Sequence, residues 1–129
     1  MTRKATCCCG NCTIEVEGEP AINALCHCGN CKRRTGSAFG WSVYFRDGQV
    51  LRQDGQFIVY AIADGTPQQR WFCNNCGSTL YWKTDFMPDH MGIAGGCFAE
   101  DSLPEPELTV SNEGRCSWLG LPASWRTAL

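Results

Sequence analysis

The chain is organised around the stretch Cys26-His27-Cys28-Gly29-Asn30-Cys31. Its three cysteines have the spacing C-x-C-x-x-C, which is too dense for three sulfurs to pair as disulfides. Thiolates packed this closely require a cation, and tetrahedral Zn²⁺ takes about four ligands, with sulfur at about 2.3 Å. The stretch therefore predicts a zinc site whose fourth position is either filled by another group or left open.

A second set of cysteines lies on both sides of this stretch. Cys73 and Cys76 form a C-x-x-C that is typical of one half of a zinc ribbon, and the cysteine-rich residues 7–12 supply the other half. On spacing alone, the two ligands from residues 7–12 are either Cys7 and Cys9 or Cys9 and Cys12. These cysteines predict a closed zinc site, with buried free thiols or an iron–sulfur cluster as the alternatives.

Once that site is closed, Cys26, Cys28 and Cys31 remain without an obvious fourth ligand. His27 lies between two of them and is expected to point to the opposite face. A zinc ion with three sulfurs and one exchangeable position is what reactive zinc chemistry needs, so we expect these three cysteines to be catalytic. The alternative is a fourth protein ligand that makes this site structural as well.

Composition narrows the class of protein. The chain has 129 residues, of which 43% are hydrophobic and 19% charged, and this predicts a single folded domain over residues 1–129. The formal net charge is -2, and the only compact basic run is Lys32-Arg33-Arg34. A nucleic-acid partner is therefore not expected, because it requires a broad basic surface. The basic run instead offsets the negative charge of the cysteine-rich site.

Eleven cysteines, an odd number in C-x-C and C-x-x-C spacings, favour metal binding over a secreted disulfide scaffold. The charged amino terminus is followed by no apolar stretch, so no secretory signal is expected and we predict a cytoplasmic protein. No apolar run approaches the roughly 18 residues of a membrane span, which predicts a soluble protein without a membrane partner. The sequence gives no indication of oligomeric state.

The pattern of apolar residues predicts an all-β fold with little helix. No segment has a sustained 3.6-residue apolar stripe, and turn signals recur about every 8 to 12 residues. Residues 38–46 are expected to form a hairpin with residues 49–52, and the central cysteine stretch is expected to lie in a loop or knuckle. The other expected strands are residues 13–17, 57–62, 69–72, 79–83, 90–95 and 108–110.

The motifs also occur in a specific order that covers nearly the whole chain. They are Cys7-x-Cys9-Gly10, Cys26-His27-Cys28-x-x-Cys31, Thr35-Gly36-Ser37, Phe39-Gly40-Trp41, Arg70-x-Phe72-Cys73-x-x-Cys76-Gly77-Ser78-x-Leu80, Ala94-Gly95 and Trp118. In combination they resemble the glutathione-dependent formaldehyde-activating enzyme family, which also includes centromere protein V. The resemblance implies a β-tent, in which antiparallel sheets fold around a structural zinc.

The resemblance also implies which residues bind metal. It places the structural zinc on Cys7, Cys9, Cys73 and Cys76. It places a second, reactive zinc on Cys26, Cys28 and Cys31, which gives two Zn²⁺ per chain. Residues 107–110 lack a histidine that many family members have near the last strand, and residues 96–98 also depart from the usual pattern. These departures bear on the substrate more than on the zinc sites.

The activity that the resemblance implies is that of a carbon–sulfur lyase, which forms S-hydroxymethylglutathione from glutathione and formaldehyde. Arg33, Arg34 and Arg70 are candidates to bind the carboxylates of glutathione. The alternative is a zinc-stabilised protein-binding module without catalytic activity. In that case the tryptophans would serve a protein partner, and the candidates are Trp41, Trp118 and Trp125.

Overall fold

The computed structural model describes residues 1–63, 65, 67–101 and 103–128. Within these residues the chain is mostly β-strand, as predicted, with a single α-helix, α1 (Gly29–Thr35). The strands are β1 (Thr2–Thr6), β2 (Thr13–Glu17), β3 (Ile22–Cys26), β4 (Gly40–Arg46), β5 (Val50–Asp54), β6 (Phe57–Ile62), β7 (Gln68–Cys73), β8 (Thr79–Thr84), β9 (His90–Ala94), β10 (Leu108–Val110) and β11 (Arg126–Thr127). No helix in the described ranges is long and apolar enough to cross a membrane.

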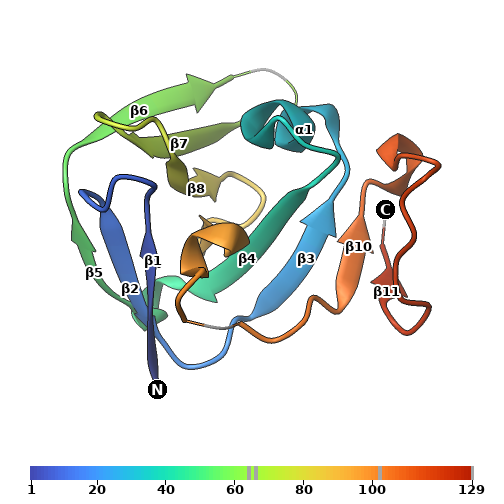
Figure 1. Cartoon of the computed structure of the whole chain (residues 1–129), viewed down its shortest axis with the longest axis horizontal. Coiled ribbons are helices and arrows are strands. Elements are labelled where there is room, and N and C mark those ends of the chain that lie inside the picture. The colour runs from blue at the N-terminus through green and yellow to red at the C-terminus, as the bar shows by residue number, and fades with distance from the viewer. Residues whose placement is uncertain (64, 66, 102, 129) are drawn as a thin grey trace.

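The strands form two sheets, which Figure 1 shows side by side. The smaller has the order β1-β2-β5, and the larger has the order β11-β10-β3-β4-β9-β8-β7-β6. The pairings are antiparallel except that β10 runs parallel to both β3 and β11. This mixed edge was not predicted, because a three-residue strand more than 80 residues after its partner leaves no hairpin signal in the sequence.

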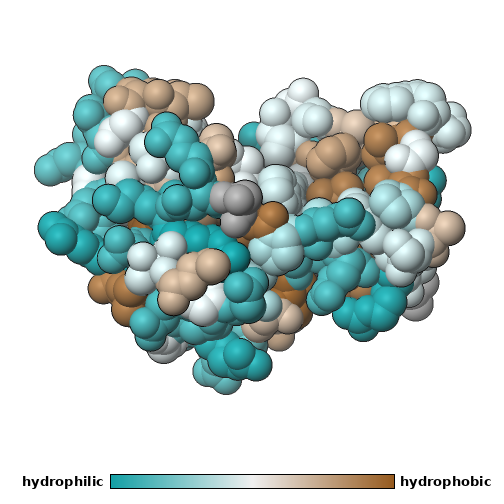
Figure 2. Space-filling model, turned by 60° about the horizontal axis from the view of Figure 1, so that its bottom comes forward, coloured by the Kyte–Doolittle hydropathy of each residue, from teal (hydrophilic) through white to brown (hydrophobic). Residues whose placement is uncertain are grey.

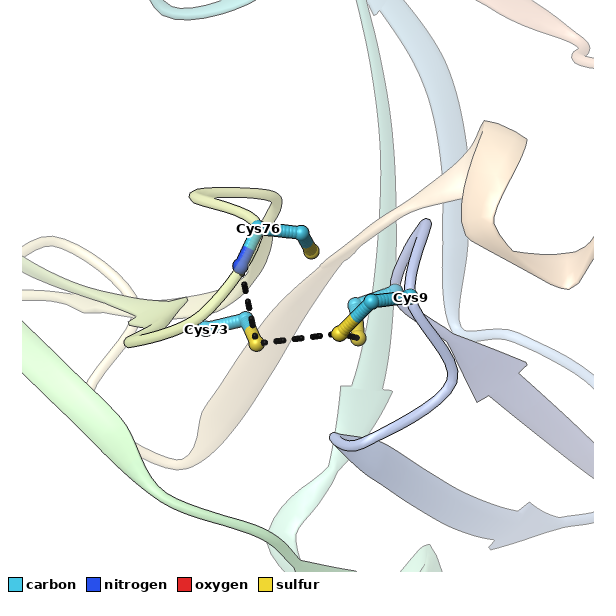
Figure 3. Close-up of side chains that lie close together, drawn as sticks. Cys9, Cys73 and Cys76 are labelled. Atoms are coloured by element: carbon cyan, nitrogen blue, oxygen red, sulfur yellow. Dashed lines mark hydrogen bonds between the residues drawn. The ribbon is translucent and has the colours of Figure 1, made fainter.

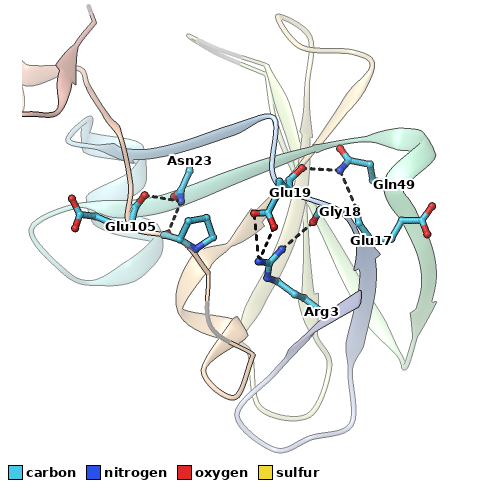
Figure 4. Close-up of polar contacts among 8 residues, drawn as sticks. Arg3, Glu17, Gly18, Glu19, Asn23, Gln49 and Glu105 are labelled. Carbon is cyan, nitrogen blue, oxygen red and sulfur yellow. Dashed lines mark hydrogen bonds and ion pairs between the residues drawn. The ribbon is translucent and has the colours of Figure 1, made fainter. Parts of the chain in front are cut away.

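The predicted hairpin of residues 38–46 with residues 49–52 is wrong. Although β4 and β5 are neighbours in sequence, β4 pairs with β3 and β9, whereas β5 pairs with β2 in the other sheet. The turn between them is the 3-10 helix η1 (Asp47–Gln49), and Gln49 Nε2 donates to the carbonyls of Glu17 and Glu19 at 3.0 and 2.8 Å (Figure 4). These bonds direct the chain from one sheet to the other.

The hydrophobic core fills the space between the two sheets. Alternate residues of the strands point into it, as the period of two predicts. The largest fully buried side chains include Phe45, Ile14, Leu80, Ile93, Val16 and Val43. Each such side chain contributes about 1.5–3 kcal/mol when it is removed from water, so this core holds the two sheets together.

Strand β3 carries the central cysteine stretch, and buried polar contacts fix its position. Asn23 Nδ2 donates to the carbonyls of Pro104 and Glu105 at 2.8 and 3.3 Å (Figure 4). Asn23 Oδ1 accepts from Trp41 Nε1 at 2.7 Å. A buried amide with three partners is costly to move, since any shift leaves it unpaired. The start of β3 is thereby held against the segment that leads into β10.

The expectation that the central cysteines lie in a loop or knuckle holds only for Cys28, because Cys26 belongs to a strand and Cys31 to a helix. Cys26 ends β3, and α1 begins three residues later (Figure 1). The sulfur of Cys28 caps the helix by accepting the N–H of Cys31 at 3.3 Å. Gly36 ends the helix with a φ of 64°, a left-handed conformation that glycine adopts without strain. The short helix escaped prediction because none of its residues is buried and no apolar stripe marks it.

Candidate metal centre

Four cysteines from two distant turns meet at one point, here called the four-cysteine cluster. Cys7 and Cys9 follow β1, whereas Cys73 ends β7 and Cys76 lies in the turn after it. All four sulfurs lie within 4.8 Å of one another, and Cys9 Sγ is 3.7 Å from the sulfurs of Cys7 and Cys73 (Figure 3). Tetrahedral Zn–S bonds place sulfurs about 3.8 Å apart, so the spacing fits zinc.

Backbone and hydroxyl donors point at these sulfurs. The N–H of Cys12 donates to Cys7 Sγ at 3.2 Å, and the N–H of Cys76 donates to Cys73 Sγ at 3.5 Å. The pKa of Cys76 is lowered to about 5, first of all by its side-chain hydrogen bond with Ser78. Hydrogen bonds of this kind stabilise the thiolate form, which is the form that binds a metal.

The geometry distinguishes between the two pairings that spacing left open. Cys12 is fully buried, and its thiol donates to the carbonyl of Gln56 at 3.4 Å, so it belongs to the core. Cys8 is exposed and lies outside the group. The sulfurs that gather with Cys73 and Cys76 are therefore those of Cys7 and Cys9. That these four bind zinc stays a prediction.

The second group, here called the three-cysteine cluster, comes from one continuous stretch. The sulfurs of Cys26, Cys28 and Cys31 lie within 4.8 Å of one another, and all three residues are half-buried. No fourth histidine, cysteine, aspartate or glutamate joins them in the described part of the chain. Among the atoms nearby is the Ser111 hydroxyl, whose oxygen lies 3.8 Å from Cys26 Sγ, within hydrogen-bond distance of the sulfur.

The pKa values of Cys26 and Cys31 are shifted in opposite directions. The pKa of Cys26 is lowered to about 5, mainly because the Cys31 thiol donates a hydrogen bond to it. The same hydrogen bond, together with burial, raises the pKa of Cys31. One thiolate is thus already favoured in the protein alone, and metal binding would release the remaining thiol protons.

His27 points away from its two cysteine neighbours, as expected from its position between them. Its side chain is fully buried, and its Nε2 is hydrogen-bonded to Thr109 Oγ1 at 2.9 Å. Thr109 Oγ1 in turn donates to Asn112 Oδ1 at 2.7 Å. This chain of bonds ties β10 to the backbone of the three-cysteine cluster, so His27 supports the cluster without belonging to it.

A cleft of about 320 Å³ lies over the three-cysteine cluster. The register of the larger sheet explains its walls, because residues that are directly opposite on neighbouring strands share a face. Ile22 on β3 pairs with Tyr44 on β4, and Trp82 on β8 pairs with Arg70 on β7. Gly92 on β9 joins the two pairs, since it lies opposite both Tyr44 and Trp82. The four side chains form one row that leads across the cleft floor.

Two of the three predicted substrate-binding arginines line this cleft. Arg34 comes from α1 and Arg70 from β7, which brings together residues that are 36 positions apart. Arg33 is exposed and is not among the lining residues. Substrate contact by any of the three stays a prediction.

Sequence reasoning missed Tyr44 and Trp82, which line the cleft together with the three cysteines and Arg70. Aromatic residues in strands are usually core residues. The residues next to Tyr44 and Trp82 in the chain do pack into the core, for example Phe45 and Tyr81. Only the register of four strands shows that these two face the cleft. To predict from the sequence that Tyr44 and Trp82 face the cleft, one would have to know that β4 and β8 both pair with β9.

The family model for glutathione-dependent formaldehyde-activating enzymes matches residues 2–113, a range that contains both clusters and all of the described residues that line the cleft. This chain belongs to that family. A crystal structure of a Rhodobacter sphaeroides protein is also similar, with a TM-score of 0.59 and 28% sequence identity over 78% of this chain and 91% of that one. No curated protein matched the chain.

Family membership agrees with the resemblance drawn from the cysteine motifs. The residues beyond the matched range include η3 (Asn112–Gly114) in part and the edge strand β11. This last segment still supports the site, because Lys32 Nζ on α1 donates to the carbonyl of Gly114. A glycine is required there, since a Cβ would collide with the carbonyl oxygen of His27.

Proposed function

We propose that this protein is a zinc-dependent enzyme of the carbon–sulfur lyase type that acts on glutathione adducts. In this proposal it joins glutathione and formaldehyde to form S-hydroxymethylglutathione, and it cleaves that adduct in the reverse direction. The observation that carries the proposal is the position of the three-cysteine cluster. Its sulfurs lie at a cleft and lack a fourth protein ligand in the described ranges, and the chain belongs to this family.

The donor sets suit two Zn²⁺ ions per chain, because closely spaced thiolates favour zinc over harder metals. Zinc held by Cys26, Cys28 and Cys31 would supply a Lewis acid that lowers the pKa of a thiol at its remaining position. None of the eleven cysteines forms a disulfide, which suits a reducing, cytoplasmic location.

The cleft walls would hold the thiol and the aldehyde next to each other. The new S–C bond takes its electrons from the thiolate, the carbonyl π electrons move to oxygen, and the proton lost by the thiol ends on that oxygen. No oxidant or reductant is involved. Two reactants held in one cleft react as if one were present at high concentration, which can supply several kcal/mol of the barrier reduction.

Tyr44 is placed to donate a hydrogen bond to the aldehyde oxygen. Trp82 Nε1 donates a hydrogen bond to Tyr44 Oη at 3.2 Å, so the tyrosine oxygen already acts as an acceptor and its own O–H can be donated to another group. Burial raises the pKa of Tyr44 above its usual 10.0, so the hydroxyl keeps its proton at neutral pH. A fixed donor beside a developing negative charge stabilises the transition state.

The alternative function is a zinc-stabilised protein-binding module. Of the three tryptophans considered for a partner surface, Trp41 donates to Asn23 and Trp125 donates to Glu105 Oε2 at 2.8 Å, while Trp118 is 75% exposed. The face in Figure 2 mixes hydrophilic residues with small hydrophobic patches, without one broad apolar surface. A single exposed tryptophan is weak support for a docking surface.

Two measurements test the proposal. Metal analysis of the purified protein is expected to give two zinc ions per chain, and the metal-loaded protein is expected to accelerate adduct formation between glutathione and ¹³C-formaldehyde, followed by NMR. One zinc per chain, or a rate no faster than the spontaneous reaction, contradicts the enzymatic function. Partial chelation separates the alternatives: reversible loss of activity in a folded protein favours the enzyme, and unfolding at any loss of metal favours the module.

A further inference from the structure

Two guanidinium groups lie in the cleft without a carboxylate partner. Among the described residues that line the cleft, none is an aspartate or a glutamate. The ion pairs in the described part of the chain involve other arginines, those at positions 3, 52 and 126. Arg34 Nη2 is buried and makes no hydrogen bond to any described group. A buried donor of this kind is costly unless a ligand supplies the acceptor.

Arg34 is held in place by the floor of the cleft. Its guanidinium lies 4.2 Å from the centroid of the Trp82 ring, a cation–π contact. Trp82 is fixed in turn by its hydrogen bond to Tyr44 and by its position over Gly92. A Cβ at Gly92 would collide with the Trp82 ring, so the glycine creates the space in which the indole lies. Residues of three strands, β4, β8 and β9, therefore fix the orientation of Arg34.

Arg70 is held independently of Arg34. It is only 9% exposed, its Nε donates to Gln68 Oε1 at 3.0 Å, and its Nη2 lies 3.5 Å from the carbonyl oxygen of Asn30. An arginine has five N–H donors, so donors remain on both guanidinium groups after these contacts. The two groups also repel each other, which adds to the effect of burial in lowering the pKa of Arg70. An anion between them would relieve that repulsion.

We infer that Arg34 and Arg70 form a subsite for a carboxylate of the thiol substrate, with Trp82 and Gly92 as positioning residues. This subsite rests on the proposed function in one respect. The thiol whose carboxylate it binds is the substrate whose sulfur lies at the three-cysteine cluster. The subsite accounts for the buried unpaired donor of Arg34 and for the lack of acidic residues among the described residues of the cleft lining. It selects thiols that carry a carboxylate over neutral thiols of similar size.

The competing role for these arginines is to offset the negative charge of the thiolates, without any contact to substrate. The two roles differ in what they predict for a neutral thiol. An arginine that only offsets the thiolates affects every thiol equally, whereas a carboxylate subsite affects only thiols that bear the carboxylate. A lysine at position 34 keeps the charge but loses the planar fork that binds a carboxylate with two hydrogen bonds.

The test compares R34Q and R70Q with the wild type, using the metal-loaded full-length protein. R52Q is the matched control, because Arg52 is an exposed arginine of the smaller sheet that pairs with Asp54 away from the cleft. KM is measured for 3-mercaptopropionate and for neutral 2-mercaptoethanol. Each cleft variant is expected to raise KM for 3-mercaptopropionate about 10- to 100-fold, the loss typical of a hydrogen bond to a charged group. R34K is expected to recover only part of it.

A second measurement does not depend on turnover. Isothermal titration with S-methylglutathione, whose blocked sulfur cannot react, is expected to show binding to the wild type and to R52Q and weaker binding to R34Q and R70Q. Circular dichroism and zinc content check that each variant is folded and loaded. If binding follows this pattern but no thiol is turned over, the subsite stands and the proposed function falls.

Other outcomes overturn the subsite. If turnover is normal and the cleft variants change KM for both thiols equally, the arginines offset the thiolates and bind no carboxylate. If R34K restores wild-type KM for 3-mercaptopropionate, charge alone suffices and the fork is not used. If the wild type shows no preference for 3-mercaptopropionate over 2-mercaptoethanol, the cleft does not select a carboxylate.

Discussion

The four-cysteine cluster joins turns that are 64 residues apart in the chain, whereas the three-cysteine cluster lies within residues 26–31. A metal bound at the first site closes a long loop and links the smaller sheet to the larger one. A metal at the second site closes only a short local loop at the end of β3. By the logarithmic dependence of loop entropy on length, the first closure constrains the unfolded chain by about 2 kcal/mol more.

The two clusters also differ in the residues that surround them. The four-cysteine cluster has four sulfurs, which complete a tetrahedral shell, and it contacts the core through buried Cys7 and Cys73. The three-cysteine cluster faces a cleft that contains Arg34, Tyr44 and Arg70. Under the proposed function, cysteine ligands would support the fold in one cluster and the chemistry in the other, and loop length and the residues beside the sulfurs are what distinguish the two.

The largest expected effect comes from breaking the four-cysteine cluster. C73S is expected to lower the free energy of unfolding by more than about 2 kcal/mol, because it removes the link between distant turns as well as a buried sulfur. Urea denaturation followed by near-ultraviolet circular dichroism measures this change. A C73S protein as stable as the wild type would show that the two sheets need no metal between them.

The matched change in the other cluster is C28S. Serine is a favourable helix N-cap, so it can replace the sulfur that accepts the N–H of Cys31, and the unfolding free energy should change by less than about 1 kcal/mol. Activity should nevertheless be lost, because the second metal loses one of three ligands. Zinc content is expected to fall from two per chain to one. If C28S unfolds when it loses this metal, the metal at the three-cysteine cluster is needed for folding, as is expected of the metal at the four-cysteine cluster.

The cysteine spacings predicted which sulfurs could meet, because C-x-C and C-x-x-C are local patterns that constrain the chain wherever they occur. They could not decide between Cys9 with Cys7 and Cys9 with Cys12, which depends on whether Cys12 points into the core. The resemblance to the family supplied that choice, and the geometry of the turn after β1 agrees with it.

The cleft could not be predicted, because it depends on contacts between strands that are distant in sequence. The alternation of β4 was clear, but its partners β3 and β9 could not be known, and the hairpin with β5 was the natural expectation from the Asp47-Gly48 turn. Arg34 and Arg70 were chosen for their charge. Their meeting in one cleft requires the order of the eight-stranded sheet.

A smaller effect is expected from Tyr44, which lines the cleft over the three-cysteine cluster and has no counterpart in a cleft at the four-cysteine cluster among the described residues. Y44F is expected to lower kcat about 100-fold, the loss typical of removing one transition-state hydrogen bond, with little change in KM. Steady-state kinetics between pH 6 and 9 measures it. Because the pKa of Tyr44 is raised, no loss of activity from its ionisation is expected in this range. An unchanged kcat would remove Tyr44 from the mechanism.

The smallest effect concerns the exposed cysteines around the four-cysteine cluster. Cys8, Cys9 and Cys76 are all exposed, yet only Cys9 and Cys76 lie within the cluster. With zinc bound, iodoacetamide is expected to modify Cys8 much faster than the other two, because a metal-bound thiolate is a weaker nucleophile and is sterically shielded. Peptide mass spectrometry reads the sites, and C8S is the control. Chelation should expose Cys9 and Cys76 to the reagent. Equal labelling of all three before chelation would mean that exposure alone governs their reactivity, and the four-cysteine cluster would then not be a metal site.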